Sequence, residues 1–184
     1  MGYLIKSEAE KRLESVRKLL MTQELDLALV YYDEFNIGNG WYLTGWCPQF
    51  ESGAVLVPRR GDPMLLGGPE SEPFAKQDSA ITATRNFPVF MVPDEEYPNA
   101  SIIDFPALFA ELQKTLGKVR RIGLVGADRI PSGCHRLLRE GFGDVTMVDI
   151  TGEYVQLRYD KSEWEVEQIG AAFKLADYAY EAML

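Results

Sequence analysis

The sequence predicts an α/β domain in which a central, mixed β-sheet is flanked by helices. Segments with strand and helix patterns alternate along the chain, which favours a largely parallel sheet. Two of the strand patterns are separated only by a short turn, so one pair of strands is expected to be antiparallel. With 184 residues, of which 46% are hydrophobic, the chain is long enough for one domain with its own core.

The first half of the chain is expected to contain one helix and three strands. Ser7 and Glu10 have the spacing of a capping box at the start of a helix. The apolar stripe of this helix comprises Leu13, Val16, Leu19 and Leu20. Residues 25–32 form a near-continuous apolar run, typical of an inner strand that is buried on both faces. Residues 33–40 are rich in Gly and Asn and predict a loop, whereas residues 53–68 predict two strands around a tight turn.

The second half continues the alternation of helix and strand. The expected elements are a short helix (72–77), a strand (80–87), a helix (104–117), a strand (121–126), a helix (131–141) and a strand (144–150). Asp104 suits the N-cap of the first long helix, which Gly117 is expected to end. Gly141 is expected to end the second long helix. Residues 86–98 contain several prolines and predict a long surface loop.

The last segment of the chain has a strong helix signal. Ser162 and Glu165 form a capping box. The residues that recur behind it at helical spacing are Val166, Ile169, Phe173, Ala176, Tyr180 and Met183. The helical spacing of apolar residues continues to the last residues, and no Gly, Asn or Pro, which usually follow a helix, occurs before Leu184. An apolar face of this width needs cover, and a second copy of the chain is one way to supply it.

The charge balance argues against nucleic acid and membrane surfaces as partners. Nineteen basic residues against twenty-eight acidic ones give a net charge of -9, whereas both partners require a positive footprint. The one basic run alternates with acidic residues and predicts a solvated helix face: Lys11, Arg12, Arg17 and Lys18 with Glu8, Glu10 and Glu14. The sequence shows neither a signal peptide nor a long apolar span, so a cytoplasmic location is expected.

The residue types needed for catalysis are sparse. His135 is the one histidine, and it cannot by itself supply the several converging ligands of a metal site. Cys134 is its neighbour in sequence, but adjacent residues of a helix do not face each other, which disfavours a Cys–His pair. Cys47 and Cys134 lie far apart and are expected to be free thiols rather than a disulfide. We therefore expect no catalytic residue, metal site or cofactor in this chain.

Three stretches, in order, resemble the N-terminal domain of the creatinase/prolidase family. They are "WYLTGW" (41–46), "GAVLVPRRGDPMLL" (53–66) and "LRYDKSEWEVEQI" (157–169). The third matches an Arg-x-x-Lys-Ser-x-x-Glu pattern at Arg158, Lys161, Ser162 and Glu165. The family consists of "pita-bread" metallopeptidases that include Xaa-Pro dipeptidases and aminopeptidase P. The resemblance implies a ribonuclease H-like motif for the mixed sheet.

The resemblance also implies a domain organisation. Residues 1–159 correspond to the family's N-terminal domain, and residues 160–184 to the start of the helix that leads into a catalytic domain. That second domain carries the family's dinuclear metal site, with Mn, Co or Zn as candidates, so the parent protein is expected to be a hydrolase. The chain is then expected to be an excised, non-catalytic piece. Its implied partners are its own catalytic domain and a second copy in a homodimer.

The family uses this domain to shape the active site of the neighbouring subunit. The loop after the "YLTG" stretch is the candidate for that role, with Trp46, Phe50, Glu51 and Ser52. The alternative for both aromatics is packing in the domain's own core. Creatinase-like members carry a basic residue after the loop aromatic, where this chain has Glu51 and Ser52. This difference favours a peptidase-like or other amide hydrolase parent over a creatinase. A competing hypothesis is a stand-alone α/β module that binds a small molecule in a closed pocket.

Overall fold

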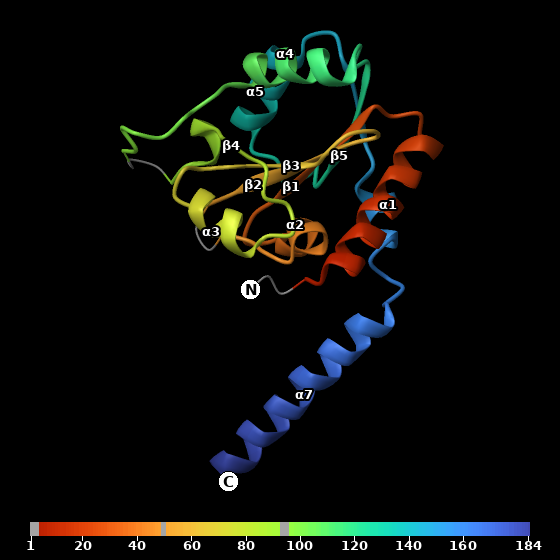
Figure 1. Cartoon of the computed structure of the whole chain (residues 1–184), viewed down its shortest axis with the longest axis vertical. Helices are drawn as coiled ribbons and strands as arrows, with labels where there is room; N and C mark the ends of the chain where they lie inside the picture. The colour runs from red at the N-terminus through yellow and green to blue at the C-terminus, as the bar shows by residue number, and fades with distance from the viewer. Residues whose placement is uncertain (1–3, 49–50, 93–95) are drawn as a thin grey trace.

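The computed structural model describes residues 4–48, 51–92 and 96–184, which form a sheet between two layers of helices (Figure 1). The strands are β1 (Leu27–Tyr32), β2 (Gly53–Pro58), β3 (Met64–Gly67), β4 (Thr84–Asn86), β5 (Arg121–Val125) and β6 (Thr146–Asp149). The helices are α1 (Lys6–Thr22), α2 (Ile37–Thr44), α3 (Glu72–Asp78), α4 (Phe105–Leu116), α5 (Ser132–Phe142), α6 (Thr151–Gln156) and α7 (Glu163–Met183), with a 3-10 turn η1 (Pro88–Phe90).

The sheet is mixed, as the sequence predicts. Its six strands follow the order β4-β3-β2-β1-β5-β6. β2 pairs antiparallel with both β1 and β3. The β2–β3 pair is the expected hairpin, whereas the antiparallel β1–β2 pair was not expected. The other pairs, β1 with β5, β3 with β4 and β5 with β6, are parallel. β1 lies in the middle and is buried at all six positions, which confirms the inner strand expected at 25–32.

Alternate residues of the central strand β1 pack into two separate hydrophobic cores, one on each face of the sheet. Leu27, Leu29 and Tyr31 pack with α4 and α5 on one face of the sheet. Ala28, Val30 and Tyr32 pack with α1, α2, α3 and α6 on the other, the arrangement seen in Figure 1 above and below the sheet. A strand that is buried on both faces has no polar side to present, which explains its continuous apolar sequence.

Two short helices were not expected from the sequence. Residues 33–40 were predicted to form a loop, but Ile37–Thr44 forms α2. The two glycines that suggested a loop are sites of close approach instead: a Cβ at Gly40 would lie 2.5 Å from the Tyr32 ring. Gly45 then ends α2 with a left-handed φ of 62°, which favours glycine. The second unexpected helix is α6, at Thr151–Gln156.

The ends of two predicted helices differ from expectation. α1 begins at Lys6 with Ile5 as its N-cap, so Ser7 and Glu10 do not form the predicted capping box. α5 continues through Gly141 to Phe142, and its C-cap is Gly143, which has a φ of 58°. Gly141 is inside the helix because α4 passes close to it, and a Cβ there would lie 2.4 Å from the Cβ of Phe105.

The segment 80–98 contains a shorter strand than predicted, and more of its side chains are buried. Only Thr84–Asn86 forms β4. Within the predicted surface loop, Phe87 and Phe90 are buried and pack against Phe105 from α4. The apolar side chains between the prolines therefore turn into the core. Residues 93–95 of this segment lie outside the described residues.

One ion-pair network ties α3 to the edge strand β4. The carboxylate of Glu72 accepts hydrogen bonds from Thr84 Oγ1 at 2.7 Å and Asn86 Nδ2 at 2.8 Å, and it pairs with Lys76 at 2.7 Å. Burial raises the pKa of Glu72, but these three hydrogen bonds outweigh it and lower the pKa from its ordinary 4.5 to about 2.

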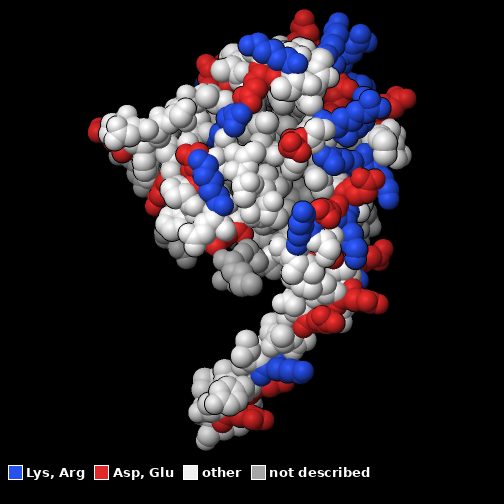
Figure 2. Space-filling model, in the orientation of Figure 1, with Lys and Arg blue, Asp and Glu red and all other residues white. Residues whose placement is uncertain are grey.

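Helix α7 projects away from the rest of the molecule (Figure 1). None of its residues from Glu163 to Met183 is buried. On the face shown in Figure 2, its charged side chains follow one edge and the remaining surface is uncharged. Its large exposed apolar side chains are Val166, Ile169, Phe173, Leu175, Tyr178, Tyr180 and Met183. None of the helices in the described ranges combines the length and the apolar composition that a membrane crossing needs.

Candidate functional site

The loop predicted to face a neighbouring active site is held at both of its described ends. Thr44 Oγ1, at the end of α2, accepts a hydrogen bond from Trp46 N at 3.0 Å. The Trp46 side chain is half-buried and packs against the core on the α2 face of the sheet. Phe50 lies outside the described residues. Trp46 thus has one part packed in the core and one part accessible, and its role at a neighbouring active site stays a prediction.

Glu51 is buried in the domain, and Ser52 is half-buried. Glu51 is only 5% exposed, and its Oε2 accepts a hydrogen bond from Ser71 N at 3.2 Å, beside the start of α3. Ser52 is half-buried and hydrogen-bonds to Tyr31, whose pKa is raised to about 12, chiefly by burial. Both residues therefore fix the end of the loop to the sheet and to α3.

The described residues near this loop do not form a metal centre. A cavity of about 500 Å³ beside the loop contains three carboxylates and a thiol among its lining residues: Trp46, Cys47, Pro48, Glu51, Glu70, Ser71, Phe74 and Asp78. No group of three or more His, Cys, Asp or Glu side chains in the described ranges could hold a metal ion. Burial raises the pKa of Cys47 to about 12, so the thiol is not activated as a nucleophile.

His135 and Cys134 differ in their burial. Both residues lie on α5, where Cys134 points into the core and His135 is half-exposed. Burial raises the pKa of the Cys134 thiol to about 11. The structure describes both cysteines as free.

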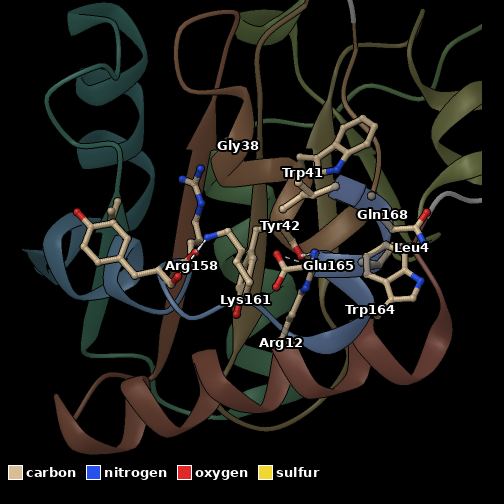
Figure 3. A pocket seen from close by; sticks show the side chains of 14 residues that line it. Leu4, Arg12, Gly38, Trp41, Tyr42, Arg158, Lys161, Trp164, Glu165 and Gln168 are labelled. Atoms are coloured by element: carbon tan, nitrogen blue, oxygen red, sulfur yellow. Dashed lines mark hydrogen bonds and ion pairs between the residues drawn. The ribbon is translucent and has the colours of Figure 1, made fainter. Parts of the chain in front are cut away.

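A polar cluster lies where α6 passes into α7, at the Arg-x-x-Lys-Ser-x-x-Glu pattern (Figure 3). Ser162 and Glu165 form the predicted capping box. Ser162 Oγ accepts from Glu165 N at 3.2 Å, and Glu165 Oε2 accepts from Ser162 N at 2.9 Å. The other carboxylate oxygen, Oε1, remains directed at Arg12 at 3.2 Å. One glutamate therefore both starts α7 and attaches it to α1.

Arg12 is the centre of this cluster, although the sequence predicted it on a solvated face. It is 5% exposed, and Glu8, one turn earlier in α1, is 4% exposed. The guanidinium pairs with Glu8 Oε1 at 3.0 Å and donates to the Tyr42 carbonyl at 2.9 Å. It also lies 4.8 Å from the ring centroid of Tyr42 and 5.6 Å from that of Trp164, within cation–π range.

A sequence signal for this burial does exist. Glu8, Arg12, Val16 and Leu20 are spaced by four residues and form the buried face of α1. Residues at this spacing lie on one side of a helix, so a buried Val16 and Leu20 indicate the same side for Arg12 and Glu8. An oppositely charged pair in line with an apolar stripe favours a buried ion pair over a solvated one.

The basic residues of the pattern join the link before α7 to α2. Arg158 Nη1 donates to Asn39 Oδ1 at 2.9 Å, and its guanidinium lies against Gly38, where a Cβ would meet Nη2 at 2.2 Å. Lys161 Nζ donates to the carbonyls of Arg158 and Tyr159. The four residues of the pattern therefore determine how the chain leaves the domain.

The same elements enclose a cavity of about 610 Å³ between α2 and the start of α7 (Figure 3). Its lining residues are Leu4, Arg12, Gly38, Trp41, Tyr42, Gly45, Val155, Arg158, Tyr159, Lys161, Trp164, Glu165, Gln168 and Ile169. The cavity is open to solvent on one side, unlike the closed pocket that the binding-module hypothesis predicts.

Comparison with known proteins relates most of the chain, up to residue 159, to one family. The family model described as the creatinase/prolidase N-terminal domain matches residues 12–159. An X-Pro aminopeptidase from Thermotoga maritima has a similar structure, with a TM-score of 0.70 and 20% identity over 92% of this chain and 42% of that chain. A prolidase from Pyrococcus horikoshii gives a TM-score of 0.64 and 17% identity over 94% of this chain and 42% of that chain.

A third similar structure, aminopeptidase P from Streptococcus thermophilus, gives a TM-score of 0.58 and 18% identity over 82% of this chain and 98% of that chain. The chain thus spans less than half the length of the first two proteins and almost all of the third. No curated protein matches the sequence. At these identities the structural similarity shows a shared fold.

Proposed function

The chain belongs to the creatinase/prolidase N-terminal domain family, and we propose that it is the non-catalytic, assembly-forming part of an Xaa-Pro peptidase-like hydrolase. In this role it supports dimerisation and shapes the active site of a neighbouring subunit. The observation that carries the proposal is α7, a 21-residue helix without a buried residue that begins at a fixed anchor on the domain. Such a helix has a defined direction and an apolar face that needs cover.

The direction of α7 follows from the Arg12 cluster. The capping box satisfies backbone groups at the start of the helix, and the Arg12–Glu165 pair ties that start to α1. The buried position of Arg12 strengthens the pair, because water screens it little. A second domain attached through α7 would therefore be presented in one orientation.

The chemistry of the proposed hydrolase would come from residues outside this chain, including its divalent metal. What this chain contributes is the loop from Trp46 to Ser52. Its described ends are tied to α2, α3 and the sheet, so the loop is positioned by rigid elements. The half-buried Trp46 has the mixed environment of an aromatic that anchors a loop and still reaches a neighbouring surface.

Replacing Trp46 in a longer hydrolase that contains this domain tests the loop's role. Trp46→Ala should lower kcat/KM for Xaa-Pro dipeptides while the domain loses less than about 3 kcal/mol of stability, the scale of a fully buried large aromatic. Phe35→Ala is the matched control, because Phe35 is an exposed aromatic on the loop before α2. If turnover is unchanged and the loss of stability exceeds about 3 kcal/mol, Trp46 serves only to pack the core of its own domain.

The 184-residue chain alone should not hydrolyse Xaa-Pro dipeptides, Xaa-Pro oligopeptides or creatine, with or without added manganese or cobalt. The basis is the single histidine and the inert thiols described above. Metal-dependent turnover that survives purification and is lost in His135→Ala would overturn the non-catalytic assignment.

A further inference from the structure

The cavity between α2 and α7 has the size and composition of a small-molecule site. Its volume of about 610 Å³ falls within the range of ligand pockets. Such sites are typically apolar with a few converging polar groups, and this cavity combines two tryptophans with three basic side chains. The Arg12 cluster accounts for one of those basic groups but not for the other two.

The charges that line the cavity are not balanced within it. Arg12 is paired with both Glu8 and Glu165. Arg158 and Lys161, by contrast, have only neutral partners among the described residues, the amide oxygen of Asn39 and two backbone carbonyls. Each keeps N–H groups beyond those bonds, since a guanidinium has five and an ammonium three. The site is therefore locally positive in a chain whose net charge is -9.

The apolar walls lie apart from these two cations. In Figure 3, Arg158 and Lys161 are on one side of the cavity, and Trp41, Trp164 and Leu4 are on the other. Trp41 is 43% exposed, so part of its ring faces open space. Indole rings offer a large, rigid surface for an aromatic or aliphatic group.

From this division we propose that the cavity binds a small amphipathic carboxylate. The carboxylate would accept hydrogen bonds from Arg158 and Lys161, and the apolar body would lie between Trp41 and Trp164. Charge-assisted bonds to a guanidinium are stronger than neutral ones, which favours an anionic head over a neutral polar one. Because the walls come from both α2 and α7, the bound molecule stabilises the direction of α7. This inference goes beyond the proposed function and does not depend on it.

Calorimetry with phenylbutyrate and its neutral analogue phenylbutanamide tests the proposal on the 184-residue chain. The two probes share the apolar body and differ in the charge of the head. Phenylbutyrate should bind at least about tenfold more tightly than the amide, equivalent to about 1.4 kcal/mol. Absence of binding at millimolar concentrations, or equal binding of the two probes, overturns the proposal.

Substitutions locate the head of the ligand. Arg158→Gln and Lys161→Gln should each reduce the preference for the carboxylate several-fold, whereas Lys174→Gln, on the exposed part of α7, should leave it unchanged. Lys161 is exposed, so its variant remains informative if Arg158→Gln lowers the stability of the fold. A preference that survives both cavity substitutions contradicts the assigned site.

The three tryptophans of the chain locate the apolar body. Trp41 and Trp164 line this cavity, whereas Trp46 lines the separate cavity beside its own loop. In proton–nitrogen NMR spectra, phenylbutyrate should shift the indole signals of Trp41 and Trp164 and leave that of Trp46 in place. A shift of Trp46 alone would place the ligand elsewhere and refute the inference.

Discussion

Removing the charge of Arg12 should destabilise the domain strongly. Arg12→Met keeps much of the side-chain volume but leaves the buried carboxylate of Glu8 without its partner, and it frees Glu165 from α1. Breaking a buried ion pair in this way costs about 3–5 kcal/mol. This is a large share of the ~5–15 kcal/mol that stabilises a typical domain. Urea denaturation followed by circular dichroism measures the loss.

A surface pair provides the matched control. Arg136 and Glu140 have the same spacing on α5 and lie 3.3 Å apart, but their side chains are 67% and 57% exposed. Arg136→Met should therefore cost less than about 1 kcal/mol. Adding Glu8→Leu to the Arg12→Met variant should recover part of the loss, because the unpaired buried carboxylate is then removed. If Arg12→Met lowers the free energy of unfolding as little as the control does, the buried ion pairs of Arg12 do not stabilise the domain as argued.

Two further predictions concern the sheet edge and the helix layer. Burial raises the pKa of Glu72, but its hydrogen bonds outweigh burial and lower the pKa to about 2 in the folded state. Glu72 therefore stabilises the fold at pH values above the pKa that it has in the unfolded chain. This contribution should be lost as the pH falls from about 5 towards 2, and Glu72→Gln should flatten the pH dependence of unfolding in that window. Gly141→Ala should cost about 1–3 kcal/mol, because the new Cβ would lie 2.4 Å from that of Phe105. Gly133 lies in the same helix, and a Cβ there would have no atom within 4 Å. Gly133→Ala should therefore stabilise the domain by about 0.5–1 kcal/mol. Thermal unfolding of the two variants measures both changes.

Three elements that depend on local pattern could be predicted from the sequence. The inner strand β1, the β2–β3 hairpin and the capping box of α7 all agree with expectation. Each rests on residues close together in the chain: an apolar run, a short turn between strands, or a Ser and Glu three residues apart.

Features that depend on distant residues were missed. α2 looked like a loop because of Gly38 and Gly40, and both glycines are explained by partners elsewhere, Arg158 and Tyr32. Arg12 was predicted to be solvated although its alignment with Val16 and Leu20 is a local signal for burial, and its second partner, Glu165, lies near the other end of the chain. Likewise, the cavity between α2 and α7 is assembled from residues near both ends of the chain.

Sedimentation of the 184-residue chain tests the proposed assembly role most directly. The exposed apolar face of α7 should bring two copies together, since a twofold contact covers both faces at once. The chain should therefore sediment as a dimer of the 20.8 kDa protomer. Replacing Phe173 and Tyr180 by Ser should shift it to monomer, while Arg136→Met should not. A wild-type chain that remains monomeric at high concentration with α7 ordered would contradict the account.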